Sequence, residues 1–189
     1  MRALVVYESM YGNTHLVAGS IADGLRETCE VTLVPVAGAT AELVAGADLL
    51  VVGAPTHLRG LSTAASRRQA AQTAAKAGSG LRLDPDADGP GMWDWLQGIG
   101  HRVGLAAVFD TRVNSFAILT GRASRRIAKL LKRHGYRLVA APQSFLVCSH
   151  NNLLDGEASC ARRWGMTLGA ASKTRIQNAP EDAGRESGG

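Results

Sequence analysis

The chain has 189 residues, of which 46% are hydrophobic and 5% aromatic, and its formal net charge is +5. This length suits one domain with a full core, and three cysteines without a CxxC pair argue against a disulfide framework or a structural zinc site. No apolar run approaches the length of a bilayer span and no leader precedes the first predicted strand, so we expect a cytoplasmic protein without a membrane span.

The N-terminal part of the chain predicts a strand, a short loop and a helix. An apolar run at residues 3–7 is followed by small and polar residues at 9–14, and apolar residues at helical spacing follow directly. The loop offers the hydroxyls of Ser9 and Thr14, the Asn13 amide and several backbone N–H groups, at the positive end of the helix. These groups predict a phosphate site that needs no lysine.

The spacing of this stretch resembles the phosphate loop of flavodoxins. That pattern has two apolar residues, an aromatic residue, Ser, Gly, Thr, and then Ala and an aliphatic residue at helical spacing. Here the matching residues are Val5, Val6, Tyr7, Ser9, Gly12, Thr14, Ala18 and Ile21. The resemblance implies FMN as cofactor, with its phosphate bound by Ser9, Met10, Tyr11, Gly12, Asn13 and Thr14. The alternative is an ordinary strand-to-helix turn at the start of an α/β domain.

The remaining sequence alternates between predicted strands and helices. Strands are expected at 31–34, 49–52, 105–109 and 137–147, the last interrupted at Pro142, and helices at 41–45, 63–76, 122–134 and after 156. The final helix is expected to bury Cys160, Trp164, Leu168 and Ala171. Five strands that alternate with helices predict an α/β doubly wound parallel sheet. The flavodoxin-like resemblance implies the strand order 2-1-3-4-5.

Two segments are expected to lack regular structure. Residues 78–91 contain DPDADGPG and predict an exposed excursion, anchored by an amphipathic turn at 93–99. Residues 174–189 are too polar to pack and predict a flexible tail beyond a single flavodoxin-like FMN-binding domain at 1–173.

In the implied strand order a ligand lies across the carboxyl ends of strands one and three. By the resemblance, Pro55, Thr56 and His57 flank one side of the flavin ring, and Asp110, Thr111 and Arg112 flank the other. Flavodoxins commonly place the ring between Trp and Tyr, which both of these loops lack. Phe116 and Trp93 are candidate substitutes, and packing in the core is the alternative role for both.

The charges near the expected ring differ from those of low-potential flavodoxins. Arg59, Arg112 and a protonated His57 are expected to stabilise the reduced anion, whereas Asp110 opposes this effect. We therefore expect a less negative potential and easier two-electron reduction, as in flavodoxin-like quinone reductases. His57 is also a candidate proton donor to a quinone, the alternative being a loop histidine that is exposed or caps the backbone. The histidines at 15, 101, 134 and 150 have no partner at metal-ligand spacing.

The segment 122–137 predicts a strongly basic helix and its flank. Its ordinary interpretation is a solvated face, and the functional alternative is a docking site for an acidic redox partner. Nucleic-acid binding is unlikely on this pattern, because interleaved aromatic residues and a known binding module are missing.

Three functions remain open from the sequence. The first is an FMN-binding electron carrier between a reductase and an acceptor protein. The second is an FMN-dependent oxidoreductase that reduces a small quinone-type substrate. The third is a flavodoxin-like domain without FMN that serves as an interaction module.

Overall fold

The structure is a computed structural model that describes residues 1–57, 60–114 and 121–178. Its centre is a parallel sheet with the order β2-β1-β3-β4-β5, in which β6 also pairs with β4. The strands are β1 (Arg2–Tyr7), β2 (Glu30–Pro35), β3 (Leu49–Pro55), β4 (Gly104–Val113), β5 (Tyr136–Leu138) and β6 (Gln143–Val147). The predicted order is confirmed. The fifth position is shared by β5 and β6, which follow one another along β4 with Pro142 between them.

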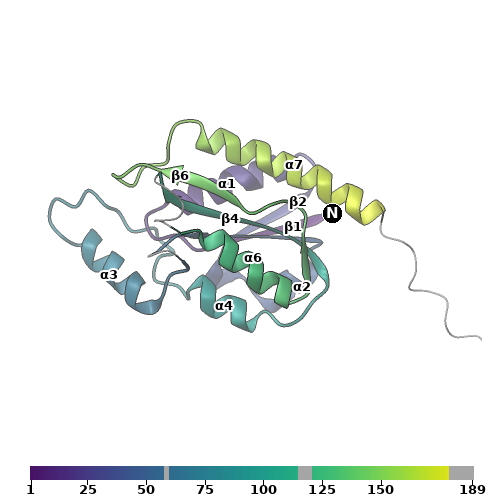
Figure 1. The fold of residues 1–189 in the computed structure, drawn as a ribbon, viewed down its shortest axis with the longest axis horizontal. Coiled ribbons are helices and arrows are strands. Elements are labelled where there is room, and N and C mark those ends of the chain that lie inside the picture. The colour runs from purple at the N-terminus through teal and green to yellow at the C-terminus, as the bar shows by residue number, and fades with distance from the viewer. Residues whose placement is uncertain (58–59, 115–120, 179–189) are drawn as a thin grey trace, which may run out of the picture.

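Helices cover both faces of this sheet (Figure 1). On one face lie α1 (Asn13–Leu25) and α7 (Glu157–Gln177), and on the other lie α2 (Ala41–Gly46), α4 (Met92–Gly98) and α6 (Ala123–Arg133). Helix α3 (Ala64–Ala74) lies outside these two layers, and a short 3-10 turn η1 (Val36–Gly38) follows β2. Leu4 and Val6 of β1 belong to the core under α2, α4 and α6, and the alternate residue Val5 belongs to the core under α1 and α7. Strand β3, and β1 after Arg2, are apolar throughout because both of their faces are buried.

Helix α7 differs from its prediction in two ways. It continues to Gln177, so the domain extends beyond the expected end at 173, and residues 179–189 of the expected tail lie outside the described residues. Its buried stripe is also shifted, because small residues face α1. Cys160 is exposed and Ala171 only half-buried, whereas Ala161, Gly165, Leu168, Gly169 and Ser172 are buried. A Cβ on Gly165 would lie 2.3 Å from the Ile21 carbonyl oxygen, so only glycine permits this close packing.

No helix in the described parts of the chain is both long and apolar enough to cross a membrane.

Residues 78–91, which we call the strap, form turns without helix or strand, as predicted. The expectation that they are exposed is wrong in the middle of the segment, where Asp84 and Ala87 are buried. The Asp84 N–H donates to the Met10 carbonyl at 2.8 Å, so the strap lies against the loop after β1. The predicted anchor that follows it is α4, in which Met92 and Leu96 are fully buried.

Strand β4 is longer than predicted, because its last residues pair on both sides. Asp110 and Thr111 are opposite Ala54 and Pro55 of β3, and β6 extends the pairing to Val113. The residues expected in a loop after the fourth strand therefore begin inside the sheet. Residues 115–120, including Phe116, lie outside the described part of the chain.

Candidate functional site

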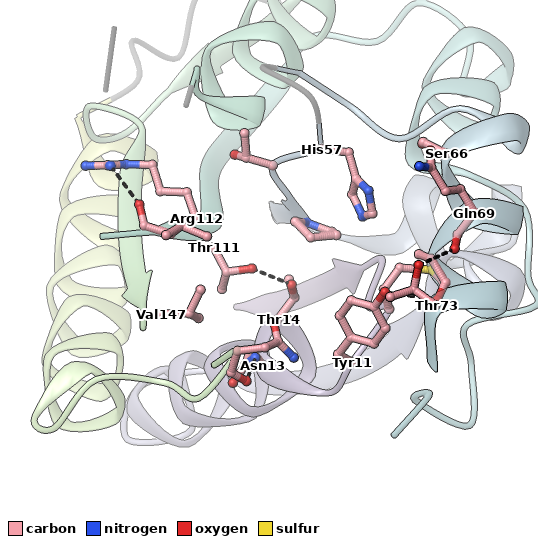
Figure 2. Close-up of a pocket in the computed structure, with 16 residues that line it drawn as sticks. Tyr11, Asn13, Thr14, His57, Ser66, Gln69, Thr73, Thr111, Arg112 and Val147 are labelled. Carbon is pink, nitrogen blue, oxygen red and sulfur yellow. Dashed lines mark hydrogen bonds between the residues drawn. The ribbon is translucent and has the colours of Figure 1, made fainter. Parts of the chain in front are cut away.

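A cavity of about 340 Å³ opens at the carboxyl ends of the strands. Its walls come from the loop after β1, the ends of β3, β4 and β6, the loop after β6, and helix α3 (Figure 2). The lining residues are Met10, Tyr11, Asn13, Thr14, Pro55, Thr56, His57, Ser66, Gln69, Ala70, Thr73, Thr111, Arg112, Val113, Val147 and Asn151. Of the twelve residues predicted for the site, nine line this cavity. Ser9 and Gly12 lie in the adjoining loop, and Asp110 lies elsewhere.

The loop after β1 brings the uncapped N-terminus of α1 to the cavity. Gly12 precedes the helix with φ of 89°, a left-handed conformation that favours glycine, and it supplies no side-chain cap. The first turn of α1 contains no acidic residue. The Ser9 hydroxyl accepts the Gly12 N–H at 3.1 Å, which fixes the turn. Because the helix dipole and its N–H groups are not neutralised by a side chain of its own, this end favours an anion.

Two hydrogen bonds join the start of α1 to distant parts of the chain. The hydroxyls of Thr14 and Thr111 share a hydrogen bond of 2.7 Å, and the Asn13 amide donates to the Asn151 carbonyl at 2.8 Å. Thr14 and Thr111 are both buried. The loop after β1 is thereby tied to β4 and to the loop after β6.

The strap supports the other side of the same loop. Asp84, whose side chain is 1% exposed, contacts His15 Nδ1 at 3.2 Å through Oδ2 and accepts the Asp86 N–H at 3.1 Å through Oδ1. The Tyr7 hydroxyl donates to Asp86 at 2.9 Å, and the Tyr7 ring stacks on His15 with centroids 4.5 Å apart. Burial, followed by the hydrogen bond to Asp86, raises the pKa of Tyr7. The sequence spacing gave His15 no partners, and only the fold places it beside Asp84 and Asp86.

Pro55, Thr56 and His57 form the wall expected from the end of β3. His57 starts a tight turn in which its N–H donates to the Gly60 carbonyl at 2.8 Å and its carbonyl accepts the Gly60 N–H at 2.7 Å. Burial lowers the pKa of His57, although the carboxylate of Glu8 partly opposes that shift. The lowered pKa disfavours the protonated, positively charged His57 that was expected beside the ring.

The opposite wall brings together Thr111 and Arg112, as predicted, but not Asp110. The Asp110 side chain is fully buried, and its Oδ2 accepts the Ser124 N–H at 2.8 Å at the start of α6. The Arg112 guanidinium donates to the Val113 carbonyl and extends away from the middle of the cavity (Figure 2). Arg59 lies outside the described residues. The described walls therefore place no cation at the middle of the cavity, where a cluster of positive charge was predicted.

Two parts of the cavity were missed in the sequence, and one predicted residue has an additional role. Tyr11, predicted for the loop after β1, contributes a ring that is held by a hydrogen bond from its hydroxyl to the Ala70 carbonyl at 3.0 Å. Helix α3 contributes Ser66, Gln69 and Thr73, whose i, i+3, i+7 spacing was a usable signal of one polar face. Asn151 lies in a left-handed conformation with φ of 60°, and its position after the last strand was the only indication.

Trp93, the other candidate for a ring contact, does not line the cavity. Its ring lies under the Arg126 guanidinium, 4.6 Å from centroid to Cζ. Trp93 therefore has the packing role that was its predicted alternative.

A doubly wound parallel sheet with an anion-ready loop after its first strand and a cavity at the topological switch point defines the flavodoxin-like class of α/β proteins. The sequence profile described as Flavodoxin matches residues 5–164. The chain belongs to the flavodoxin family.

Solved structures agree with this fold. An archaeal flavodoxin superposes with a TM-score of 0.64 at 18% identity, covering 92% of this chain and 99% of that one. Flavodoxin 1 from Bacillus cereus gives 0.61 at 19% identity, covering 95% and 100%. The flavodiiron protein from Giardia intestinalis gives 0.63 at 20% identity, where the match covers 95% of this chain but 38% of that one. No curated protein sequence matches the chain.

Proposed function

We propose that the protein binds FMN in this cavity and serves in electron transfer or two-electron reduction at the flavin. The observation that carries the proposal is the uncapped N-terminus of α1, which meets the cavity without a carboxylate in its first turn. A helix end of this kind favours a phosphate. A volume of about 340 Å³ lies within the range of small-molecule and cofactor sites.

The side chains present fit the two ends of FMN. At the phosphate end, Ser9, Asn13 and Thr14 supply hydroxyl and amide groups around the helix terminus. At the ring end, Pro55, Tyr11 and Val147 offer apolar surface, while backbone groups after β3 and β4 can bond the polar edge of the ring. Asp110 is left out of the proposed contacts, because its carboxylate is buried at the start of α6.

FMN, once bound, supplies one- and two-electron chemistry, and the residues of this chain determine how it is held. Thr56 connects the wall of the cavity to helix α6, because it lines the cavity and its hydroxyl accepts the Ala123 N–H at 3.0 Å. A shift of this wall would therefore also disturb α6. The Tyr11 ring is fixed at its hydroxyl, so it can contact a planar ligand with little loss of side-chain entropy.

The electrons pass to a redox partner protein or to a small quinone-type substrate. The second candidate is favoured by the polar, uncharged wall from Ser66, Gln69 and Thr73, which leaves room beside the ring site for a neutral molecule with carbonyl groups. His57 is the proposed proton donor to such a quinone. Because its pKa is lowered, only the minor protonated form donates, so this activity is expected to rise as the pH falls below neutral.

The absorbance spectrum of the purified protein tests the proposal. We expect the yellow flavin spectrum as isolated, or after addition of FMN to the apoprotein, with one FMN per chain. Failure to take up FMN would instead support the alternative, an interaction module without cofactor. Steady NAD(P)H oxidation with a quinone and no added reductase would identify the enzyme. Reduction only through a separate reductase would identify the carrier.

A further inference from the structure

Helix α6 and its flanks carry an unusual concentration of positive charge. Residues 121–137 contain seven Lys and Arg residues and no Asp or Glu. Six of these cations are exposed. One, Arg126, lies over the Trp93 ring, and the other five, which we call the basic face, are Arg125, Lys129, Lys132, Arg133 and Arg137. None of the ion pairs found between described residues includes a side chain of this face. Like charges also recur at i, i+3 and i+4 along α6, a spacing that destabilises a helix.

The position of these cations along α6 is unfavourable for the helix itself. Lys132 and Arg133 occupy the last turn, where the helix dipole stabilises positive charge. Arg125 lies in the first turn, at the positive end of the dipole, and no acidic residue is present there. The N-terminus is capped from outside instead, because Thr56 and Asp110 accept the N–H groups of Ala123 and Ser124. Helix stability therefore explains the C-terminal cations but not Arg125 or the central Lys129.

The N-terminal end of the basic face lies next to the candidate cofactor site. Thr56, which caps α6, lines the cavity. The Arg126 guanidinium, held over Trp93, is also close to Gly60, the residue that closes the turn begun by His57. A protein that covers the basic face from its N-terminal end would thus meet the loop that forms one wall of the cavity.

We propose that the basic face is the docking site of an acidic redox protein. This inference rests on the proposed function and names the partner class for the same site. Unpaired Arg and Lys side chains attract a carboxylate-rich surface and raise its association rate. Docking here brings the partner's redox centre to the cavity edge at Thr56 and His57. Each encounter with a reduced iron–sulfur partner moves one electron to FMN, and two encounters with uptake of one proton complete its reduction.

The test uses the FMN-loaded protein and, as probe, an acidic plant-type [2Fe–2S] ferredoxin in its reduced form. The variant Arg125→Glu/Lys129→Glu reverses two charges on the basic face. The matched control, Arg163→Glu/Lys173→Glu, makes the same net change at exposed positions of α7, on the other face of the sheet. Rates of reduction are followed by stopped flow between low and physiological salt, and binding of oxidised ferredoxin is measured by titration with and without FMN.

At low salt we expect the α6 variant to lower the second-order rate about tenfold or more and the α7 control to lower it less than about threefold. The difference should shrink as salt screens the charges. Equal effects of the two variants, or none, would overturn the docking site. Equal or tighter binding of a DNA duplex at the basic face would also overturn it in favour of nucleic acid. A chain that binds ferredoxin at α6 but takes up no FMN would refute the proposed function and leave the docking site standing.

Discussion

The two sides of the cavity, which we call the phosphate side and the ring side after the parts of FMN proposed to bind there, are constructed differently. On the phosphate side, residues 9–14 are held by β4, by the loop after β6 and by the strap, and buried polar groups there are bonded to one another. On the ring side, the His57–Gly60 turn closes on itself through its own backbone, and helix α3 forms the outer wall. The first side is held by contacts to three distant segments. On the second side the long-range bonds include those of Thr56 to Thr111 and Ala123, and the described ends of the turn that follows, His57 and Gly60, bond each other.

Because of this difference, we expect the two sides to differ in the substitutions that they tolerate. A group bonded from three directions loses several partners when one residue changes, so effects on the phosphate side should be large. A turn whose described ends, His57 and Gly60, bond each other can change its side chains at lower cost. Substitutions on the two sides should therefore differ in size, and the following three predictions run from the largest expected effect to the smallest.

Gly12→Ala is expected to have the largest effect, because a non-glycine residue at φ of 89° costs about 1–2 kcal/mol. The FMN-saturated protein should lose that amount of unfolding free energy, or the loop should relax and weaken FMN binding about tenfold. Gly19→Ala is the control in the same helix, since no atom lies within 4 Å of its added Cβ. It should be neutral or stabilising by up to about 1 kcal/mol. Urea unfolding measures the change in stability, and FMN titration measures the change in affinity. If Gly12→Ala changes neither quantity, the assigned loop geometry is contradicted.

Asp84→Asn tests the strap. The amide can replace only one of the two acceptors that Asp84 offers to His15 and Asp86, so about 1 kcal/mol of stability should be lost. FMN dissociation should accelerate, and proteolysis within residues 78–91 should become faster. Asp88→Asn, at an exposed neighbouring position, is the matched control and should change neither rate. If both variants behave alike, the strap does not support the phosphate loop.

His57→Gln should have the smallest effect, which should appear only in the pH dependence of the stability. Burial lowers the folded-state pKa of His57, so the unfolded chain binds more protons between that value and the ordinary value of 6.5. Stability must then fall as the pH drops through this window. The substitution should remove part of that slope, by less than about 1 kcal/mol, and leave FMN affinity nearly unchanged. Denaturant unfolding at pH 5, 6 and 7 measures it, and an unchanged slope would mean that His57 is not buried in solution.

Much of the fold followed from local sequence. Continuous apolar runs predicted the strands, and Pro142 correctly marked the break between β5 and β6 because proline cannot continue the ladder. The stripe on α7 was misplaced for a physical reason. Hydrophobicity favoured Cys160, which is exposed, whereas close packing on α1 favoured Gly165 and Gly169. Trp164, also predicted, does pack against the Phe109 and Phe145 rings.

In the candidate site, too, some features were predictable from neighbouring residues and others depend on contacts between distant residues. The sequence by itself determined the anion end of α1, because a loop of small residues, a left-handed glycine and an uncapped helix are properties of neighbouring residues. Only the tertiary structure decided that Asp110 caps α6, that His15 meets Asp84, and that Asn151 faces the cavity. Those contacts join residues far apart in the chain, and no local pattern encodes which distant backbone will lie beside a side chain once the sheet has formed.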